Sequence, residues 1–250
     1  MGGILSRKKK KPSRTIHVSP KKQPKSQTPP KEQAEITSTS NNACNVAFCK
    51  MPMEQSPIAI PSIQSIPNAS KVSITFGSTE AEAYYQDFNI FFTWTGGARA
   101  SLILNGIKYT PLQFHFHTPS EHTIEGTQYP FEMHIVYTSE TKDIAIVAFV
   151  FKYGDIEDNF LQQIWPVIPK LKPHKPREPV GIVDGNSLLS GREDFYRYSG
   201  AEKGGVEWVL VRQPRIVSPR QVAVLFDALH TANARPLQPL TGRDVTLYVT

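Results

Sequence analysis

The sequence predicts a mostly β fold of the α+β class, preceded by a disordered basic tail. Three observations carry this prediction. Seven runs of strand-forming residues lie between residues 71 and 213, whereas only two segments have helical character. Glycine-containing turn signals separate several of these runs. The first 31 residues contain ten Lys or Arg, no Asp or Glu and few large apolar side chains, a composition that cannot offset the entropy of folding.

The chain therefore divides into a tail, residues 1–45, and one folded domain, residues 46–250. About two hundred residues are enough to bury a full core. Beyond residue 31, the 18 Lys and Arg stand against 22 acidic residues, so that this part carries a net charge of −4. The basic character of the whole chain thus belongs to the tail.

Local patterns place the elements in order along the domain. Asn105-Gly106 is a strong signal for a two-residue hairpin, and Gly96-Gly97 and Gly126 mark further breaks. Ser218-Pro219 is a typical helix start, with Ser as N-cap and Pro at the first helical position. The predicted strands are 71–76, 88–93, 100–104, 113–116, 132–137, 144–151 and 206–213, and the predicted helices are 156–164 and 220–229.

Histidines and carboxylates are concentrated in two neighbouring predicted strands. Alternate side chains of a strand point to opposite faces, so Gln113, His115 and His117 share one face. The same period puts Glu132 and His134 on one face of the second strand. Three imidazoles can then meet at one point and leave a fourth position open, which is the arrangement of a catalytic zinc.

The residues beside these histidines favour the metal over the simpler alternative. That alternative is a pair of strands whose histidines are satisfied by hydrogen bonds alone. A metal-bound imidazole usually donates its second N–H to a carboxylate or a carbonyl. Gln113 lies two residues from His115, and Glu132 lies two residues from His134. We therefore predict Zn²⁺ bound by His115, His117 and His134, with Gln113 and Glu132 orienting the rings.

The segment QFHFHTPSEHTI, together with YPFEMHIVY, resembles the core of the α-class carbonic anhydrases. Further motifs of that family occur in the same order between residues 50 and 250: QSPI at 55–58, YRYSG at 196–200, VxW at 206–208 and RPxQPL at 235–240. The resemblance implies a large, twisted, mainly antiparallel sheet with peripheral helices, and a zinc ion on its central strands.

The resemblance also implies the chemistry, which is the reversible hydration of CO2 to bicarbonate by a zinc-dependent lyase. Zinc lowers the pKa of a bound water toward neutrality, an effect for which carbonic anhydrase is itself the standard example. Four apolar residues match the family positions that wall the CO2 pocket, although ordinary core packing is the alternative for each of them: Val136, Ile146, Val206 and Trp208.

Glu121 matches the catalytic carboxylate that, in this family, accepts a hydrogen bond from a threonine that orients the zinc-bound hydroxide. Here the chain departs from the family pattern. The family has the ten residues SLTTPPCTEG between YRYSG and VxW, whereas this chain has five, Ala201-Glu202-Lys203-Gly204-Gly205, without any hydroxyl group. Losing one preorganised donor costs about 10²–10³ in rate. The sequence therefore predicts reduced activity.

A second departure concerns proton transfer. The family's shuttle histidine aligns near Gln86, and glutamine cannot relay protons by titrating. Two other functions therefore stay open. One is a catalytically impaired, carbonic-anhydrase-like zinc-binding module tethered at a membrane. The other is an electrostatic adaptor that acts through its tail, which would leave the intact histidine pattern unexplained.

The start of the chain, MGGILS, fits the N-myristoylation pattern with Gly2 as acceptor. One acyl chain binds membranes weakly, and Arg7 to Lys11 supply the polybasic patch that usually completes such an anchor. The alternatives are a solvated charged tail or a nucleic-acid-binding arm. We predict contact of residues 1–14 with an anionic membrane surface and expect no nucleic acid partner.

No apolar stretch of a secretory signal follows the basic start. The resemblance implies that Cys49 has lost its usual disulfide partner, which lies in the missing loop, and this agrees with a reducing compartment. We therefore expect a cytoplasmic protein anchored to the cytoplasmic face of a membrane.

Overall fold

The computed structural model describes residues 56–68, 71–97, 99–200, 205–240 and 242–250. The predicted tail with Gly2, its boundary near residue 45, Cys49 and most of the shortened loop, residues 201–204, lie outside the described residues. Among the helices of the described part, none is long and apolar enough to cross a membrane.

The described chain is mostly β, as the sequence predicts. Its helices are α1 (Asn159–Ile164) and α2 (Pro219–Leu229), with 3₁₀ turns η2 (Trp165–Lys170) and η3 (Gly185–Leu188). Its strands are β1 (Ala59–Ile60), β2 (Ser65–Pro67), β3 (Val72–Thr75), β4 (Ser78–Gln86), β5 (Asn89–Trp94), β6 (Ser101–Leu104), β7 (Ile107–His117), β8 (Thr123–Ile124), β9 (Thr127–Gln128), β10 (Phe131–Ser139), β11 (Ile144–Tyr153), β12 (Glu178–Asp184), β13 (Phe195–Ser199), β14 (Glu207–Val217) and β15 (Thr246–Val249).

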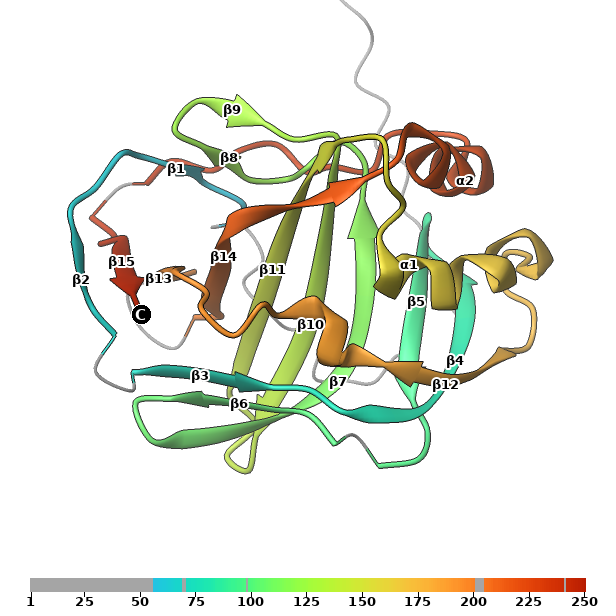
Figure 1. Ribbon diagram of the computed structural model, residues 1–250, viewed down its shortest axis with the longest axis horizontal. Coiled ribbons are helices and arrows are strands. Elements are labelled where there is room, and N and C mark those ends of the chain that lie inside the picture. Colours follow the sequence, from blue (N-terminus) through green and yellow to red (C-terminus); the bar gives the residue numbers. More distant parts are fainter. Residues whose placement is uncertain (1–55, 69–70, 98, 201–204, 241) are drawn as a thin grey trace, which may run out of the picture. The chain divides into compact units, whose positions relative to one another are not determined.

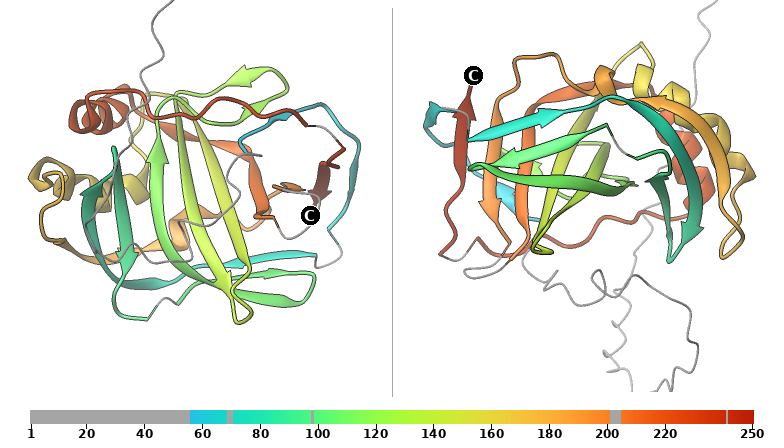
Figure 2. Two further views of the ribbon diagram at one scale, coloured as in Figure 1. Left: turned by 180° about the vertical axis from the view of Figure 1, so that it is seen from behind. Right: turned by 90° about the horizontal axis from the view of Figure 1, so that it is seen from below.

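Twelve of these strands form one sheet in the order β12-β4-β5-β7-β10-β11-β14-β13-β15-β2, with β3 and β6 attached beside β7. All pairs are antiparallel except β11–β14 and β15–β2. Strands β7, β10 and β11 run side by side through the middle of the sheet (Figure 1). The twist and curl of the sheet are clear from below (Figure 2). The mainly antiparallel sheet with peripheral helices is confirmed.

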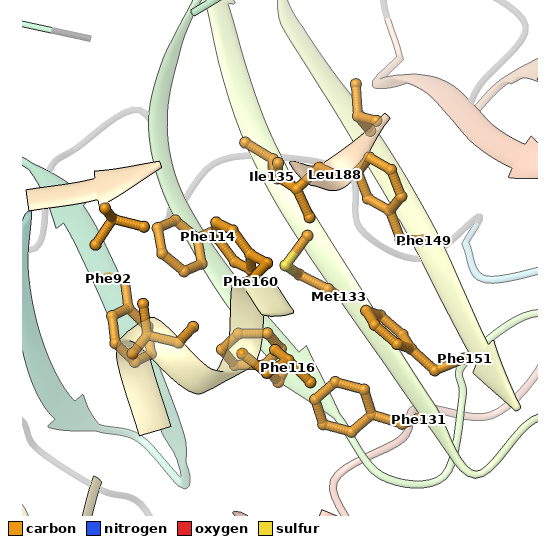
Figure 3. Close-up of a cluster of buried hydrophobic side chains, with 14 of the residues drawn as sticks. Phe92, Phe114, Phe116, Phe131, Met133, Ile135, Phe149, Phe151, Phe160 and Leu188 are labelled. Atoms are coloured by element: carbon orange, nitrogen blue, oxygen red, sulfur yellow. The ribbon is translucent and has the colours of Figure 1, made fainter. Parts of the chain in front are cut away.

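The two faces of the central strands carry different chemistry because the strand period is two. Phe114 and Phe116 of β7 pack into the larger apolar core, together with Met133 of β10 and Phe149 of β11. Figure 3 shows these side chains with Phe160 of α1 against them. The opposite face carries the histidines and a smaller apolar cluster that includes Trp208. The aromatic core thus packs against the strands that carry the candidate site and fixes their positions.

Several local predictions are confirmed, and others need correction. Asn105 and Gly106 both have positive φ and join β6 to β7 as a hairpin. Helix α2 begins at Pro219 with Ser218 as its N-cap. The predicted helix start at Ile156 is wrong, because the Asp158 side chain accepts hydrogen bonds from the amides of Phe160 and Leu161 and so begins α1 at Asn159.

Asp158 also joins α1 to the sheet. Its second carboxylate oxygen accepts hydrogen bonds from Nε and Nη2 of Arg215 on β14, at 2.9 and 2.6 Å. The side chains of Asp158 and Arg215 are only 3% and 18% exposed. Breaking a buried ion pair by removing one partner leaves the other charge uncompensated.

We therefore expect Asp158→Ala to lower the free energy of unfolding by about 3 kcal/mol, from the lost cap and the unpaired arginine together. Urea denaturation followed by tryptophan fluorescence measures the change. Asp155→Ala, at an exposed position three residues earlier, is the matched control and should change stability by less than about 0.5 kcal/mol. Equal stability of the two variants would contradict the joining role of Asp158.

Candidate metal centre

The register between β7 and β10 brings the three predicted histidines together. His134 lies directly opposite His115, and Glu132 lies opposite His117. The ring centroids of the histidines are 4.7 to 5.2 Å apart. One ring nitrogen from each of His115, His117 and His134 lies within 4.8 Å of the other two, and all three side chains are buried. The convergence expected from strand periodicity is present.

Each ring is oriented through its other nitrogen. His115 Nδ1 lies 3.0 Å from Gln113 Oε1, and His134 Nε2 lies 2.7 Å from Glu132 Oε1. Both contacts are the ones that the sequence predicts for Gln113 and Glu132. They leave Nε2 of His115 and Nδ1 of His134 for a metal ion.

The third histidine is oriented by a residue that the sequence prediction missed. His117 Nδ1 lies 3.1 Å from the main-chain oxygen of Asn233. The Asn233 side chain accepts a hydrogen bond from the amide of Thr118 and donates one to the carbonyl of Phe116, and so fixes this segment on the end of β7. Among the described residues, the buried Nε2 of His117 has no hydrogen-bond partner.

Burial prepares His115 and His117 to bind a metal ion as neutral ligands. Burial lowers the pKa of His115 well below its usual value, and the neighbouring histidines act in the same direction. Burial also lowers the pKa of His117, to about 4. A neutral imidazole offers the lone pair that a metal requires. Three such nitrogens, each fixed through its partner, fit a divalent ion such as zinc with a fourth position open.

Glu132 belongs to a network behind the candidate metal site. Its Oε1 lies 2.7 Å from Nδ1 of His122, its Oε2 accepts from the His122 amide, and His122 Nε2 lies 2.8 Å from the Tyr198 hydroxyl. Burial would raise the pKa of Glu132, but the charges of His122 and His134 and hydrogen bonds from both hold it well below its usual range. Because both ring nitrogens of His122 are engaged, it acts as a structural residue rather than as a ligand.

We expect Glu132→Gln to weaken zinc binding by about 10- to 100-fold, the usual effect of losing a partner of a ligating histidine. Competition with a coloured chelator measures the affinity. Glu125→Gln, at an exposed turn position between β8 and β9, is the control. An unchanged affinity in Glu132→Gln would mean that His134 does not bind the ion.

Glu121 lies beside the histidines, but its main partner is Arg235. The main-chain amide and Nε of Arg235 donate to Oε1 at 3.0 and 2.7 Å, and Nη2 donates to Oε2 at 2.7 Å. Burial would raise the pKa of Glu121, but the hydrogen bonds from Arg235, with the charges of His117 and His134, lower it to about 2. The predicted catalytic carboxylate is therefore ionised and firmly held.

A cavity of about 420 Å³ lies over the three histidines. Ile146, Val206 and Trp208 line it, as the resemblance implies for a CO2 pocket. Val136 does not line it, because this residue is completely buried in the smaller apolar cluster and pairs with Ile146. Three of the four predicted wall residues thus line the cavity, and the fourth, Val136, packs in the smaller apolar cluster.

The opposite side of the cavity is formed by the turn between β4 and β5. Asp87 and Phe88 have positive φ at this turn and line the cavity, and Phe88 is 74% exposed. Gln86, at the aligned shuttle position, donates to the Asp87 carboxylate at 2.9 Å. Among the described residues, the only histidines that line this cavity are His115, His117 and His134.

Fold and site together define a mostly β protein with three buried histidines, placed as metal ligands would be, at the floor of a partly apolar cavity. A family profile described as eukaryotic-type carbonic anhydrase matches residues 39–249. The chain belongs to this family, which is the α-class family that its motifs resemble, and whose general reaction is the hydration of CO2.

Individual relatives show how far the similarity extends. Alpha carbonic anhydrase 8 of Arabidopsis thaliana is 36% identical over 170 residues, which are 64% of this chain and 43% of that protein. Carbonic anhydrase Nec1 of Nesocodon mauritianus is 30% identical over 213 residues, 80% of this chain and 76% of that protein. The chain thus spans less than half of the first relative and about three quarters of the second.

A solved structure shares the fold. The α-carbonic anhydrase of Thermovibrio ammonificans, in complex with the inhibitor sulfanilamide, is 32% identical and superposes with a TM-score of 0.69, covering 80% of this chain and 89% of that one.

Proposed function

We propose that this chain catalyses the zinc-dependent, reversible hydration of CO2 to bicarbonate and a proton, at a reduced rate. The observation that carries the proposal is the arrangement of His115, His117 and His134. Each has one nitrogen fixed by a protein partner and the other turned toward a common point beneath the cavity. A bound zinc ion supplies a Lewis acid and makes water nucleophilic at neutral pH.

The residues of the chain supply the remaining parts of the reaction site. Ile146, Val206 and Trp208 offer apolar surface, which suits CO2 because this substrate is small and has no net dipole. Trp208 also packs edge-on against the His134 ring, with centroids 5.0 Å apart, and excludes water from that side. Bicarbonate, the charged product, is disfavoured on an apolar wall and leaves into solvent.

The reduced rate follows from two missing groups: the hydroxyl donor near Glu121, and a titratable side chain beside the turn between β4 and β5. The family's hydroxyl donor is missing from residues 201–205, and the hydrogen bonds that Glu121 accepts come from Arg235. Orientation by a preorganised donor is worth about 10²–10³ in rate. Gln86 supplies no titratable group at the shuttle position.

Stopped-flow CO2 hydration on zinc-loaded protein tests this proposal. The colour change of a pH indicator reports the protons that the reaction releases. A rate above buffer that disappears on chelation and returns with zinc is the expected result. A rate equal to buffer, with one zinc bound per chain, would instead favour the second candidate, a carbonic-anhydrase-like zinc-binding module. The missing threonine loop is the observation that favours this second candidate.

We further propose that the chain is held at the cytoplasmic face of a membrane by myristoylated Gly2 and the basic run from Arg7 to Lys11. The sequence pattern alone supports this proposal. Gly2→Ala should move the protein from the membrane to the soluble fraction of a eukaryotic cell, and replacement of the five basic residues by Gln should do so in part. Unchanged fractionation of Gly2→Ala would contradict the anchor.

A further inference from the structure

Arg235 is the first residue of the RPxQPL motif, and the proposed reaction gives it no role. It follows Asn233, whose main chain and side chain fix this segment on the end of β7 beside His117. Arg235 lines the cavity over the histidines. Its position is therefore set by the same contacts that set the candidate metal site.

The Arg235 guanidinium forms a bidentate ion pair with the Glu121 carboxylate. Nε and Nη2 each donate to a different carboxylate oxygen at 2.7 Å, and the main-chain amide adds a third donor. The Glu121 side chain is fully buried, and that of Arg235 is 28% exposed. Such a planar fork fixes the orientation of a carboxylate as well as its charge.

Without this partner, the carboxylate would be a rival ligand. Glu121 Oε2 lies 3.9 Å from Nδ1 of His134, the nitrogen left for the metal. Asp and Glu oxygens are zinc ligands as imidazoles are, and a catalytic site needs its fourth position open. An ionised Glu121 that was free to turn would therefore close the site.

We propose that Arg235 is a positioning residue that holds Glu121 back from the metal and thereby keeps the fourth position open. This inference rests on the proposed function, because it concerns the same metal site. In the family that this chain resembles, a threonine engages the equivalent carboxylate. The five residues 201–205 contain no hydroxyl group, so that Arg235 is the main partner of Glu121 in this chain.

The test compares Arg235→Met with the native chain, because Met keeps an unbranched side chain but lacks the guanidinium group that pairs with Glu121. Two quantities are measured: zinc affinity by chelator competition, and azide affinity by visible absorption of the cobalt-substituted protein. Arg235→Met should bind zinc at least as tightly as the native chain and bind azide about 10- to 100-fold more weakly, the size of effect that partners of metal ligands usually have. Arg212→Met, at an exposed ion pair, should change neither value.

A second substitution separates positioning from general damage. Arg235→Met combined with Glu121→Gln removes both partners of the buried pair, and a neutral amide is a poor metal ligand, so azide affinity should return toward the native value. Unchanged azide affinity in Arg235→Met, or no recovery in the double variant, overturns the inference. Should Arg235→Met fail to fold, Arg235→Lys carries the same comparison, since it keeps the charge without the fork.

Failure of the proposed function gives a different result. If the native chain binds neither zinc nor azide, both the proposed function and this inference are wrong. If the native chain binds zinc and azide, and Arg235→Met binds azide equally well, the inference alone is wrong.

Discussion

His117→Ala is expected to bind zinc more than about 100-fold more weakly than the native chain and to hydrate CO2 no faster than buffer. Losing a partner of a ligand costs about 10- to 100-fold in metal affinity, and losing a ligand costs more. His117 Nε2 is buried without a hydrogen-bond partner among the described residues, so it is available to the ion, and the substitution removes one of three ligands. Chelator competition and stopped-flow hydration measure the two effects.

His174→Asn is the matched control for this variant. His174 is exposed and has a φ of 56°, a conformation that asparagine adopts more readily than most residues. It should keep native zinc affinity and native activity. Tight, stoichiometric zinc in a folded His117→Ala protein would show that the ion is bound elsewhere, and the three-histidine site would have to be abandoned.

Replacing residues 201–205 by the ten-residue family loop SLTTPPCTEG is expected to raise kcat/KM by about 10²–10³. The reason is that the replacement restores a hydroxyl donor of the kind that such sites use to orient the attacking group, and donors of this kind have that effect on rate. Stopped-flow CO2 hydration at saturating zinc measures the gain. Zinc affinity should stay unchanged, because the three histidines and their partners are untouched.

The same loop with valine in place of each threonine is the control for loop length. It should give no gain. An equal gain from both loops would mean that the length of the segment matters and not its threonine hydroxyl groups. Oε2 of Glu121 accepts only one hydrogen bond from Arg235 and can accept another from the restored threonine. We therefore expect Arg235→Met to be less harmful with the threonine loop than without it.

The elements that the sequence predicted well are those buried in the middle of the sheet. Strands β10 and β11 consist almost entirely of buried residues, and β-branched and aromatic side chains dominate them. Strand β4 was missed, because its sequence STEAEAYYQ contains Glu and Ala, which are weak strand formers. It is a strand because β5 and β12 pair with it on either side.

The length of β7 and β14 was also underestimated. Pro111 interrupts the strand pattern of β7, and the structure accommodates it at an irregularity in the register with β10. In β14 the polar residues Arg212 and Gln213 mark an apparent end. The strand continues because its register with β11 shifts at this point, between Phe149 and Phe151, and pairing resumes at Arg215.

The sequence by itself determined which side chains share a face, because a strand has a period of two whatever its neighbours are: Gln113, His115 and His117 on one strand, Glu132 and His134 on the next. Only the tertiary structure decided which residues far apart in the sequence are in contact. Asn233 reaches His117, and Arg235 reaches Glu121, 116 and 114 positions along the chain. No local pattern encodes such contacts, since they depend on the register of the strands and on the path of the segment that follows α2.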